Sequence, residues 1–180
     1  IARHDGYYLK SISADGEVAL RRVRAHTHFS DWATAQDETE ALLSKRSVHL
    51  VTITVTESGY YTDPNGNLNV ADPTITAEVA GGKAQSVYGY LRAALGLRVA
   101  STAAPLTIAC CDNIQQNGKM LHRNLLSYLN ACGDKALATW VAANVAFPCS
   151  MVDRITPRSP AALSSELTTL VGKEVASPIM

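Results

Sequence analysis

The sequence lacks the patterns of several common kinds of site. Its four cysteines, Cys110, Cys111, Cys132 and Cys149, show no C-x-x-C spacing, so neither a zinc knuckle nor a disulfide framework is indicated. We expect all four to be reduced packing residues. The five histidines are not spaced like metal ligands, and we expect structural or surface roles for them and no metal. No G-x-G-x-x-G occurs, so the glycine-rich turn that holds a dinucleotide phosphate is missing.

Charge and hydropathy argue against large anionic partners. The 16 Lys and Arg residues balance 16 Asp and Glu residues, and the longest basic cluster is Arg21-Arg22-Val23-Arg24. This leaves no electrostatic footprint for a nucleic acid or an anionic membrane. No apolar run approaches the ~20 residues of a membrane-spanning helix, and the first ten residues lack the apolar core of a signal peptide. We therefore expect a cytoplasmic protein with a small-molecule partner.

The order of the predicted elements indicates an α/β domain. With 47% hydrophobic residues, the 180-residue chain can bury one sizeable core, and we treat residues 1–180 as a single domain. Residues 7–13 and 17–24 are rich in β-formers around Asp15-Gly16, which predicts an antiparallel hairpin. Strands and helices then alternate, as in a Rossmann-type, mostly parallel sheet flanked by helices. The predicted elements are a helix at 37–45, a central parallel strand at 47–56 covered on both faces, a loop at 62–73, a helix at 85–100, a strand at 105–110, a helix at 118–131 capped by Asn117, a helix from Asp134 to Val145, and a helix from Ser159-Pro160 to Gly172, followed by a strand.

Three polar segments stand where this fold gathers ligands. Residues 54–61, "TVTESGYY", and 111–118, "CDNIQQNG", each follow a predicted strand, and "FPCSMVDRITPR" follows at 147–158. In open α/β sheets, ligands bind beyond the carboxyl ends of the strands. Together these segments resemble the polyol-specific long-chain dehydrogenases, the mannitol dehydrogenase family, and within it most of all the D-arabinitol 4-dehydrogenase branch.

The resemblance also bears on the ends of the chain. Members of this family are substantially longer, with an N-terminal glycine-rich turn for the cofactor diphosphate and a helical C-terminal domain that carries a catalytic Lys, Asn and His. The resemblance thus implies a middle fragment, the later part of a nucleotide-binding domain, whose missing remainder supplies those groups. We expect the 180 residues alone to be inactive.

Asn113 is the candidate catalytic residue. Oxidation of a secondary alcohol gives the oxygen alkoxide character, which an amide N–H can stabilise. By resemblance, Asn113 matches the family asparagine of the oxyanion site and also borders the cofactor. The alternative is that Asn113 only forms a turn or caps the next helix.

Two further segments are expected at the cofactor. The resemblance places Val152 and Asp153 in the cofactor and substrate pocket, with Asp153 binding polyol hydroxyls; a salt bridge to Arg154 is the alternative. It also places the segment Glu57, Ser58 and Gly59 beside the nicotinamide or its ribose. Here the alternative is a solvated carboxylate at the end of a strand.

The resemblance implies an NAD-dependent enzyme that oxidises D-arabinitol to D-xylulose. Cys149 and Ser58 depart from the commonest family pattern, which leaves the exact polyol open, and the choice of NAD over NADP lies outside this chain. The alternatives within the family are a mannitol 2-dehydrogenase or a uronate reductase. From other classes we keep a non-catalytic nucleotide-binding module, and a thiol hydrolase with Cys111 as nucleophile and His122 as base.

Overall fold

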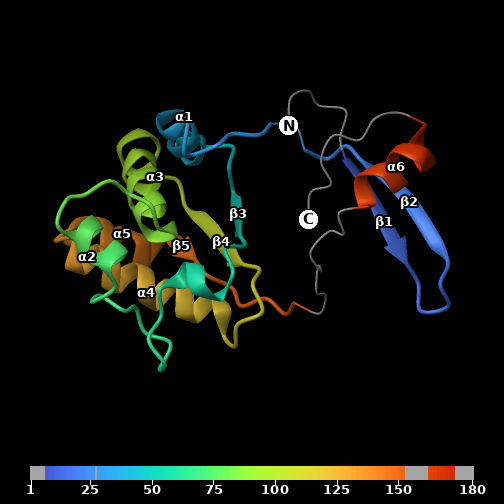
Figure 1. The fold of residues 1–180 in the computed structure, drawn as a ribbon. Coiled ribbons are helices and arrows are strands. Elements are labelled where there is room, and N and C mark those ends of the chain that lie inside the picture. The colour runs from blue at the N-terminus through green and yellow to red at the C-terminus, as the bar shows by residue number, and fades with distance from the viewer. Residues whose placement is uncertain (1–6, 27, 153–161, 173–180) are drawn as a thin grey trace.

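A three-stranded parallel sheet forms the centre of the fold. The computed structural model describes residues 7–26, 28–152 and 162–172. Its sheet has the order β3 (Leu50–Ile53), β4 (Leu106–Cys110), β5 (Val145–Ala146). Helix α3 (Val87–Ser101) connects the first two strands, and α4 (Asn117–Ala131) and α5 (Lys135–Asn144) connect the last two (Figure 1). This arrangement confirms the predicted α/β class.

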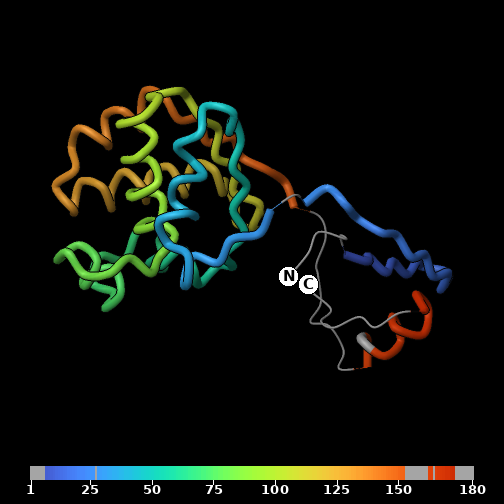
Figure 2. The backbone as a smooth tube through the Cα atoms, turned by 90° about the horizontal axis from the view of Figure 1, so that it is seen from above, coloured from blue at the N-terminus to red at the C-terminus, as the bar shows by residue number. Residues whose placement is uncertain are grey.

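The N-terminal hairpin is also confirmed. Strands β1 (Tyr7–Ile12) and β2 (Val18–Val23) pair antiparallel, and Gly16 adopts a φ of +86° in the turn between them. The hairpin lies beside α6 (Leu163–Val171), away from the parallel sheet (Figures 1 and 2). An ion pair between Lys10 and Glu166 joins the two.

Two short elements were not anticipated. Helix α2 (Pro73–Val79) begins at the end of the predicted 62–73 loop, where the Asp72 carboxylate accepts from Thr74 N at 2.8 Å and proline occupies the first turn. Strand β5 begins at Val145, the last residue of a predicted helix, and two residues are too few for a strand pattern. The predicted helix at 37–45 is present as α1 (Gln36–Ala41) with a 3-10 turn, η1 (Leu42–Ser44), and a second such turn, η2 (Glu57–Tyr60), follows β3.

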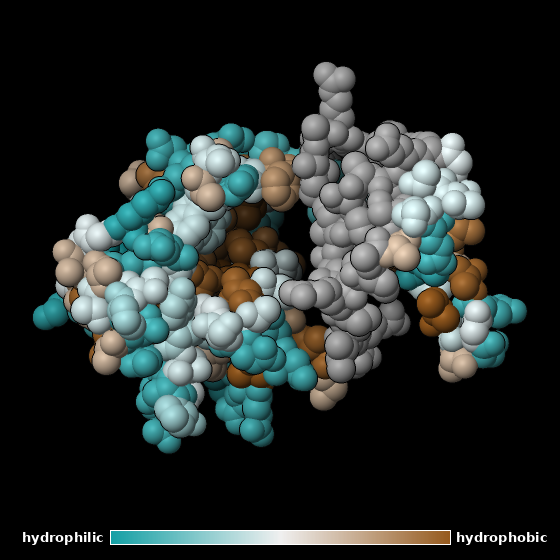
Figure 3. All heavy atoms as spheres, in the orientation of Figure 1, coloured by the Kyte–Doolittle hydropathy of each residue, from teal (hydrophilic) through white to brown (hydrophobic). Residues whose placement is uncertain are grey.

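Apolar stripes of the helices form the core against one face of the sheet. Leu91 and Leu95 of α3, Ile108 of β4, and Leu121 and Leu125 of α4 are fully buried. Each such side chain contributes about 1.5–3 kcal/mol to folding through its burial. The space-filling view shows hydrophobic residues gathered in a hollow of this part of the molecule, with a mostly hydrophilic surface around it (Figure 3).

Residues 47–56 do contain the predicted parallel strand, but the prediction that this strand is central and covered on both faces is wrong. Within the described residues β3 pairs with β4 alone, and β4 is the central strand. Ile53 pairs with Cys110 on the face that the helices cover, whereas Leu50 points to the other face and is 58% exposed. A β-branched run indicates a strand, but the neighbour that would cover it is a tertiary property.

A buried arginine fastens α3 to the start of the sheet. The Arg98 side chain is fully buried, on the same face of α3 as Leu91 and Leu95. Its guanidinium donates to five backbone carbonyl oxygens, which replace the water that burial removes. Burial lowers the pKa of this guanidinium from its ordinary value. The acceptors are the carbonyl oxygens of Leu43, Lys45, Val48, Ala104 and Pro105, at 2.6–3.2 Å.

Candidate functional site

The three polar segments meet at the carboxyl edge of the sheet. Cys111 N donates to Ile53 O at 2.8 Å and extends the ladder between β3 and β4 by one bond. The next residue, Asp112, accepts a hydrogen bond from the turn that follows β3. From the third segment, Ser150 Oγ donates to Cys110 O at 2.5 Å. Segments that are far apart in the sequence therefore share this edge, as expected for an α/β ligand site.

The Asp112 carboxylate joins the ends of β3 and β4. It is only 7% exposed. One oxygen accepts from Val55 N at 2.9 Å and from the Tyr60 hydroxyl at 2.6 Å, and the other accepts from Thr56 N at 3.3 Å. Burial, together with the bond to Asp112, raises the pKa of Tyr60 well above its ordinary value, so the hydroxyl stays a donor.

Thr56 holds a backbone conformation that residues other than glycine rarely adopt. Its φ is 63° and its ψ is 165°. Such a conformation costs about 1–3 kcal/mol, persists only where neighbouring bonds enforce it, and clusters at functional sites. Here the enforcing partner is the Asp112 carboxylate on Thr56 N.

Asn117 connects the third segment to this edge. The Asn117 residue is only 1% exposed. Its amide nitrogen donates to Ser150 Oγ at 2.9 Å and to Asp112 O at 3.1 Å, and its amide oxygen accepts from Ser150 N at 3.0 Å. The prediction that Asn117 caps α4 is therefore wrong. Gln116, with a φ of 53°, precedes the helix without a side-chain cap, and Asn117 is already its first residue.

The predicted site residues surround this bonded framework on the surface. Asn113 is exposed, directly after Asp112, and the exposed Glu57 and Ser58 lie on the turn that Asp112 binds. Gly59 and Val152 are half-buried, with the Cβ of Val55 3.0 Å from the point where a Cβ on Gly59 would lie. Asp153, like the predicted cap at Ser159-Pro160, lies outside the described residues. The structure thus brings Asn113 and the Glu57–Gly59 turn to one edge.

Sequence reasoning missed Asp112, Tyr60 and Ser150. Each lies within one of the three polar segments, but its side chain binds other parts of the protein and does not face a ligand. The signal for Asp112 was its place directly after a buried strand, where a carboxylate has to find partners on the neighbouring turn. Tyr60 and Ser150 gave no separate signal, because their partners are distant in the sequence.

The geometry does not support the thiol hydrolase alternative. The Cys111 thiol, half-buried, donates to Ala109 O at 3.7 Å, while the His122 ring stacks on Phe147 with centroids 4.7 Å apart. All four cysteines are free, but Cys149 is exposed, so the expectation that all four pack is wrong for it. Among the residues described, no group of three or more His, Cys, Asp and Glu could hold a metal ion. In that same part of the chain no helix is long and apolar enough to cross a membrane.

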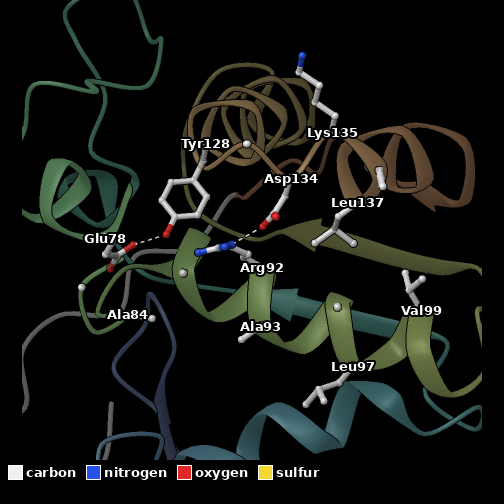
Figure 4. Close-up of a pocket in the computed structure, with 15 residues that line it drawn as sticks. Glu78, Ala84, Arg92, Ala93, Leu97, Val99, Tyr128, Asp134, Lys135 and Leu137 are labelled. Atoms are coloured by element: carbon white, nitrogen blue, oxygen red, sulfur yellow. Dashed lines mark hydrogen bonds and ion pairs between the residues drawn. The ribbon is translucent and has the colours of Figure 1, made fainter. Parts of the chain in front are cut away.

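A groove of about 770 Å³ lies elsewhere, among the helices (Figure 4). Leu97 of α3 and Lys135 and Leu137 of α5 line it, and Arg92 pairs with Asp134 across it. None of its lining residues belongs to the three polar segments. The groove is therefore separate from the candidate site at the sheet edge.

Comparison with known proteins places the chain in a family. Residues 1–175 match the family model described as the mannitol dehydrogenase Rossmann domain. The chain is 38% identical to mannitol 2-dehydrogenase of Pyrenophora tritici-repentis and 31% identical to D-arabinitol 4-dehydrogenase of Klebsiella pneumoniae, with 97% of this chain covered in both.

A solved structure shows the same fold in a longer protein. The ternary complex of Pseudomonas fluorescens mannitol 2-dehydrogenase with NAD and D-mannitol superimposes with a TM-score of 0.78 at 28% identity, covering 91% of this chain. The chain spans about a third of these proteins: 31% and 38% of the two relatives, and 34% of the solved chain. With a match to the Rossmann-domain model that runs through nearly all its residues and a fold that agrees, the chain belongs to the mannitol dehydrogenase family.

Proposed function

We propose that this protein is an NAD-dependent sugar alcohol dehydrogenase in which this chain forms the later part of the nucleotide-binding domain. The observation that supports this most is the exposed Asn113, held at the carboxyl edge of the sheet beside the turn that begins at Glu57. This is the position at which α/β sheets bind nucleotides and their substrates.

The groups exposed at this edge fit the nicotinamide half of NAD. The Glu57 carboxylate and Ser58 hydroxyl are accessible hydrogen-bonding groups for ribose hydroxyls, and the Asn113 amide can donate to an oxygen. Val152 and Asp153 complete the proposed pocket from the third segment. The diphosphate needs a glycine-rich turn, which this sequence lacks. The residues present thus fit the part of the cofactor next to the reacting carbon.

The reaction converts a secondary alcohol to a ketone. The C–H bond at the carbinol carbon breaks, and its electron pair leaves as a hydride that the nicotinamide of bound NAD accepts. The hydroxyl proton passes to a base, for which the family resemblance indicates a lysine outside this chain. Asn113 donates its amide N–H to the oxygen while negative charge develops there, and Asp153 orients the neighbouring hydroxyls.

D-arabinitol is our first candidate substrate, and D-mannitol is the second. The resemblance of residues 105–122 and 141–161 to D-arabinitol 4-dehydrogenases favours the first. The 38% identity to a mannitol 2-dehydrogenase, against 31% to a D-arabinitol 4-dehydrogenase, favours the second. The two substrates share the configuration of the attacked carbon and differ in chain length, five carbons against six, so a pocket that measures the length of the sugar alcohol would separate them.

The test is a panel of pentitols and hexitols offered to the full-length protein with NAD and with NADP. We expect NADH to form with D-arabinitol or D-mannitol, at a rate that a metal chelator leaves unchanged. Failure to reduce either cofactor with any sugar alcohol would overturn the proposal. We expect the 180-residue chain by itself to be inactive, and turnover by that chain would contradict its assignment as part of a longer enzyme.

A further inference from the structure

The turn after β3 takes its shape from a side chain on the next strand. We propose that Asp112 is a positioning residue for alcohol oxidation: its carboxylate fixes the turn at residues 55–60 and, through the adjoining backbone, Asn113. This inference rests on the function proposed above. Asp112 itself is buried and does not need to touch the cofactor or the substrate.

The Asp112 carboxylate accepts hydrogen bonds from the backbone just beyond the end of the sheet ladder. The last backbone bond between the two strands runs from Cys111 N to Ile53 O. Beyond it, the backbone N–H groups of Val55 and Thr56 donate to Asp112 instead of to another strand. Bonds to an ionised carboxylate are stronger than neutral ones, so this side chain can hold a strained turn.

The turn at residues 57–59 depends on the conformation of Thr56. Gly59 N donates to Thr56 O at 3.1 Å, and the hydroxyl oxygens of Thr56 and Ser58 lie 3.2 Å apart. The φ of 63° at Thr56 therefore sets the direction in which Glu57 leaves the strand. Loss of the bond at Thr56 N would let the backbone relax and reorient the whole turn.

The backbone of Asp112 is fixed as firmly as its side chain. Its carbonyl oxygen accepts from Ile114 N at 2.8 Å and from Asn117 Nδ2 at 3.1 Å. This carbonyl belongs to the peptide that leads into Asn113. Movement of Asp112 would therefore shift Asn113 and the Glu57 turn together, although both are exposed.

Glu78 provides a matched control for a purely structural carboxylate. It is 1% exposed and, like Asp112, is fully bonded: it accepts from Gln85 N, Ser86 N, Ser86 Oγ and Tyr128 Oη. These partners lie among the helices and not at the carboxyl edge of β3 and β4. Changing Glu78 to glutamine thus makes the same chemical change in a buried place away from the proposed site.

The experiment compares Asp112→Asn and Glu78→Gln in the full-length protein. The carboxylate accepts hydrogen bonds from three donors, whereas the asparagine amide turns its own N–H groups toward one or more of them and loses those bonds. Because a shift of about 1 Å can cost two orders of magnitude in rate, we expect Asp112→Asn to lower kcat at least about 10-fold. Glu78→Gln should stay within about 2-fold of the wild type below its unfolding temperature. Equal losses of kcat in both variants would reduce Asp112 to a structural residue and overturn the inference.

Two further variants separate positioning from folding. Adding Thr56→Gly to Asp112→Asn should recover most of the lost kcat, because glycine adopts this backbone conformation without help. Tyr60→Phe removes one donor to Asp112 and keeps the ring, and we expect a loss of about 3-fold. This milder variant tests the inference if Asp112→Asn does not fold; an unchanged kcat in Tyr60→Phe would then count against it.

Amide hydrogen exchange tests the inference without any turnover. Exchange at residues 55–60 should be faster in Asp112→Asn, or in Tyr60→Phe, than in the wild type, whereas Glu78→Gln should leave it unchanged. If the wild-type protein oxidises no sugar alcohol, the proposed function fails, and this measurement still decides whether Asp112 holds the turn. Unaltered exchange at these residues in Asp112→Asn would overturn the inference by itself.

Discussion

Asn117 and Ser150, 33 residues apart in the sequence, bind each other through a reciprocal pair of hydrogen bonds. Asn117 Nδ2 donates to Ser150 Oγ at 2.9 Å, and Ser150 N donates to Asn117 Oδ1 at 3.0 Å. The pair draws the segment after β5 onto the first turn of α4. The third polar segment thereby reaches the edge where β3 and β4 end.

The segment after β5 lies so close to α4 that there is no room for a side chain at Gly118. A Cβ there would lie 2.3 Å from Pro148 O and 2.6 Å from Phe147 O, both of which are backbone atoms. We expect Gly118→Ala to lower the free energy of unfolding by about 1–3 kcal/mol, as overpacking does. The control is Gly96→Ala in α3, which meets nothing within 4 Å and should raise helix stability by up to about 1 kcal/mol. Urea unfolding followed by circular dichroism measures both; equal effects would contradict the close approach.

Arg98 should matter for stability more than any exposed arginine. Arg98→Met removes a buried guanidinium and leaves five carbonyl oxygens without this donor. We expect the free energy of unfolding to fall by about 3 kcal/mol or more. Arg123→Met is the matched control. Exposed Arg123 donates to the carbonyl oxygen of Gly66, and its replacement should cost less than about 1 kcal/mol. Similar losses in denaturant titrations of the two variants would refute this role.

Asn113 should act on the rate and not on cofactor affinity. If its amide stabilises the developing oxyanion, Asn113→Ala in the full-length protein lowers kcat by about 100-fold or more. The Kd for NADH, measured by fluorescence titration, should change far less than kcat. Asn130→Ala, an exposed asparagine on α4, is the control and should leave both quantities unchanged. Weakened NADH binding with a normal kcat would reassign Asn113 to holding the cofactor.

The cysteines should differ in their reactivity toward alkylating reagents. Cys149 is exposed, whereas Cys110 is fully buried, and burial raises the pKa of its thiol. Because the thiolate is the reactive form, a raised pKa lowers its fraction near pH 8 and slows the reaction. We expect iodoacetamide to label Cys149 first and Cys110 only after unfolding, as followed by peptide mass spectrometry. Early labelling of Cys110 in the folded chain would show that the core at the end of β4 opens.

Much of the fold could be read from local patterns. The hairpin followed from the Asp15-Gly16 turn, and the helices α3 and α4 followed from apolar residues at helical spacing. The short strand β5 could not be predicted, because two residues show no periodicity. Local patterns also fail to show which strands lie at the centre of the sheet: Leu50 belongs to an apolar run and yet is exposed.

For the site, the sequence by itself determined which segments carry polar groups after strands, and its motifs indicated the family. Only the tertiary structure decided that Asp112 binds the β3 turn and that Asn117 binds Ser150 instead of capping its helix. The physical reason is that side-chain patterns follow the period of a local element, whereas a buried polar group takes its partners from whichever backbone lies nearest after folding.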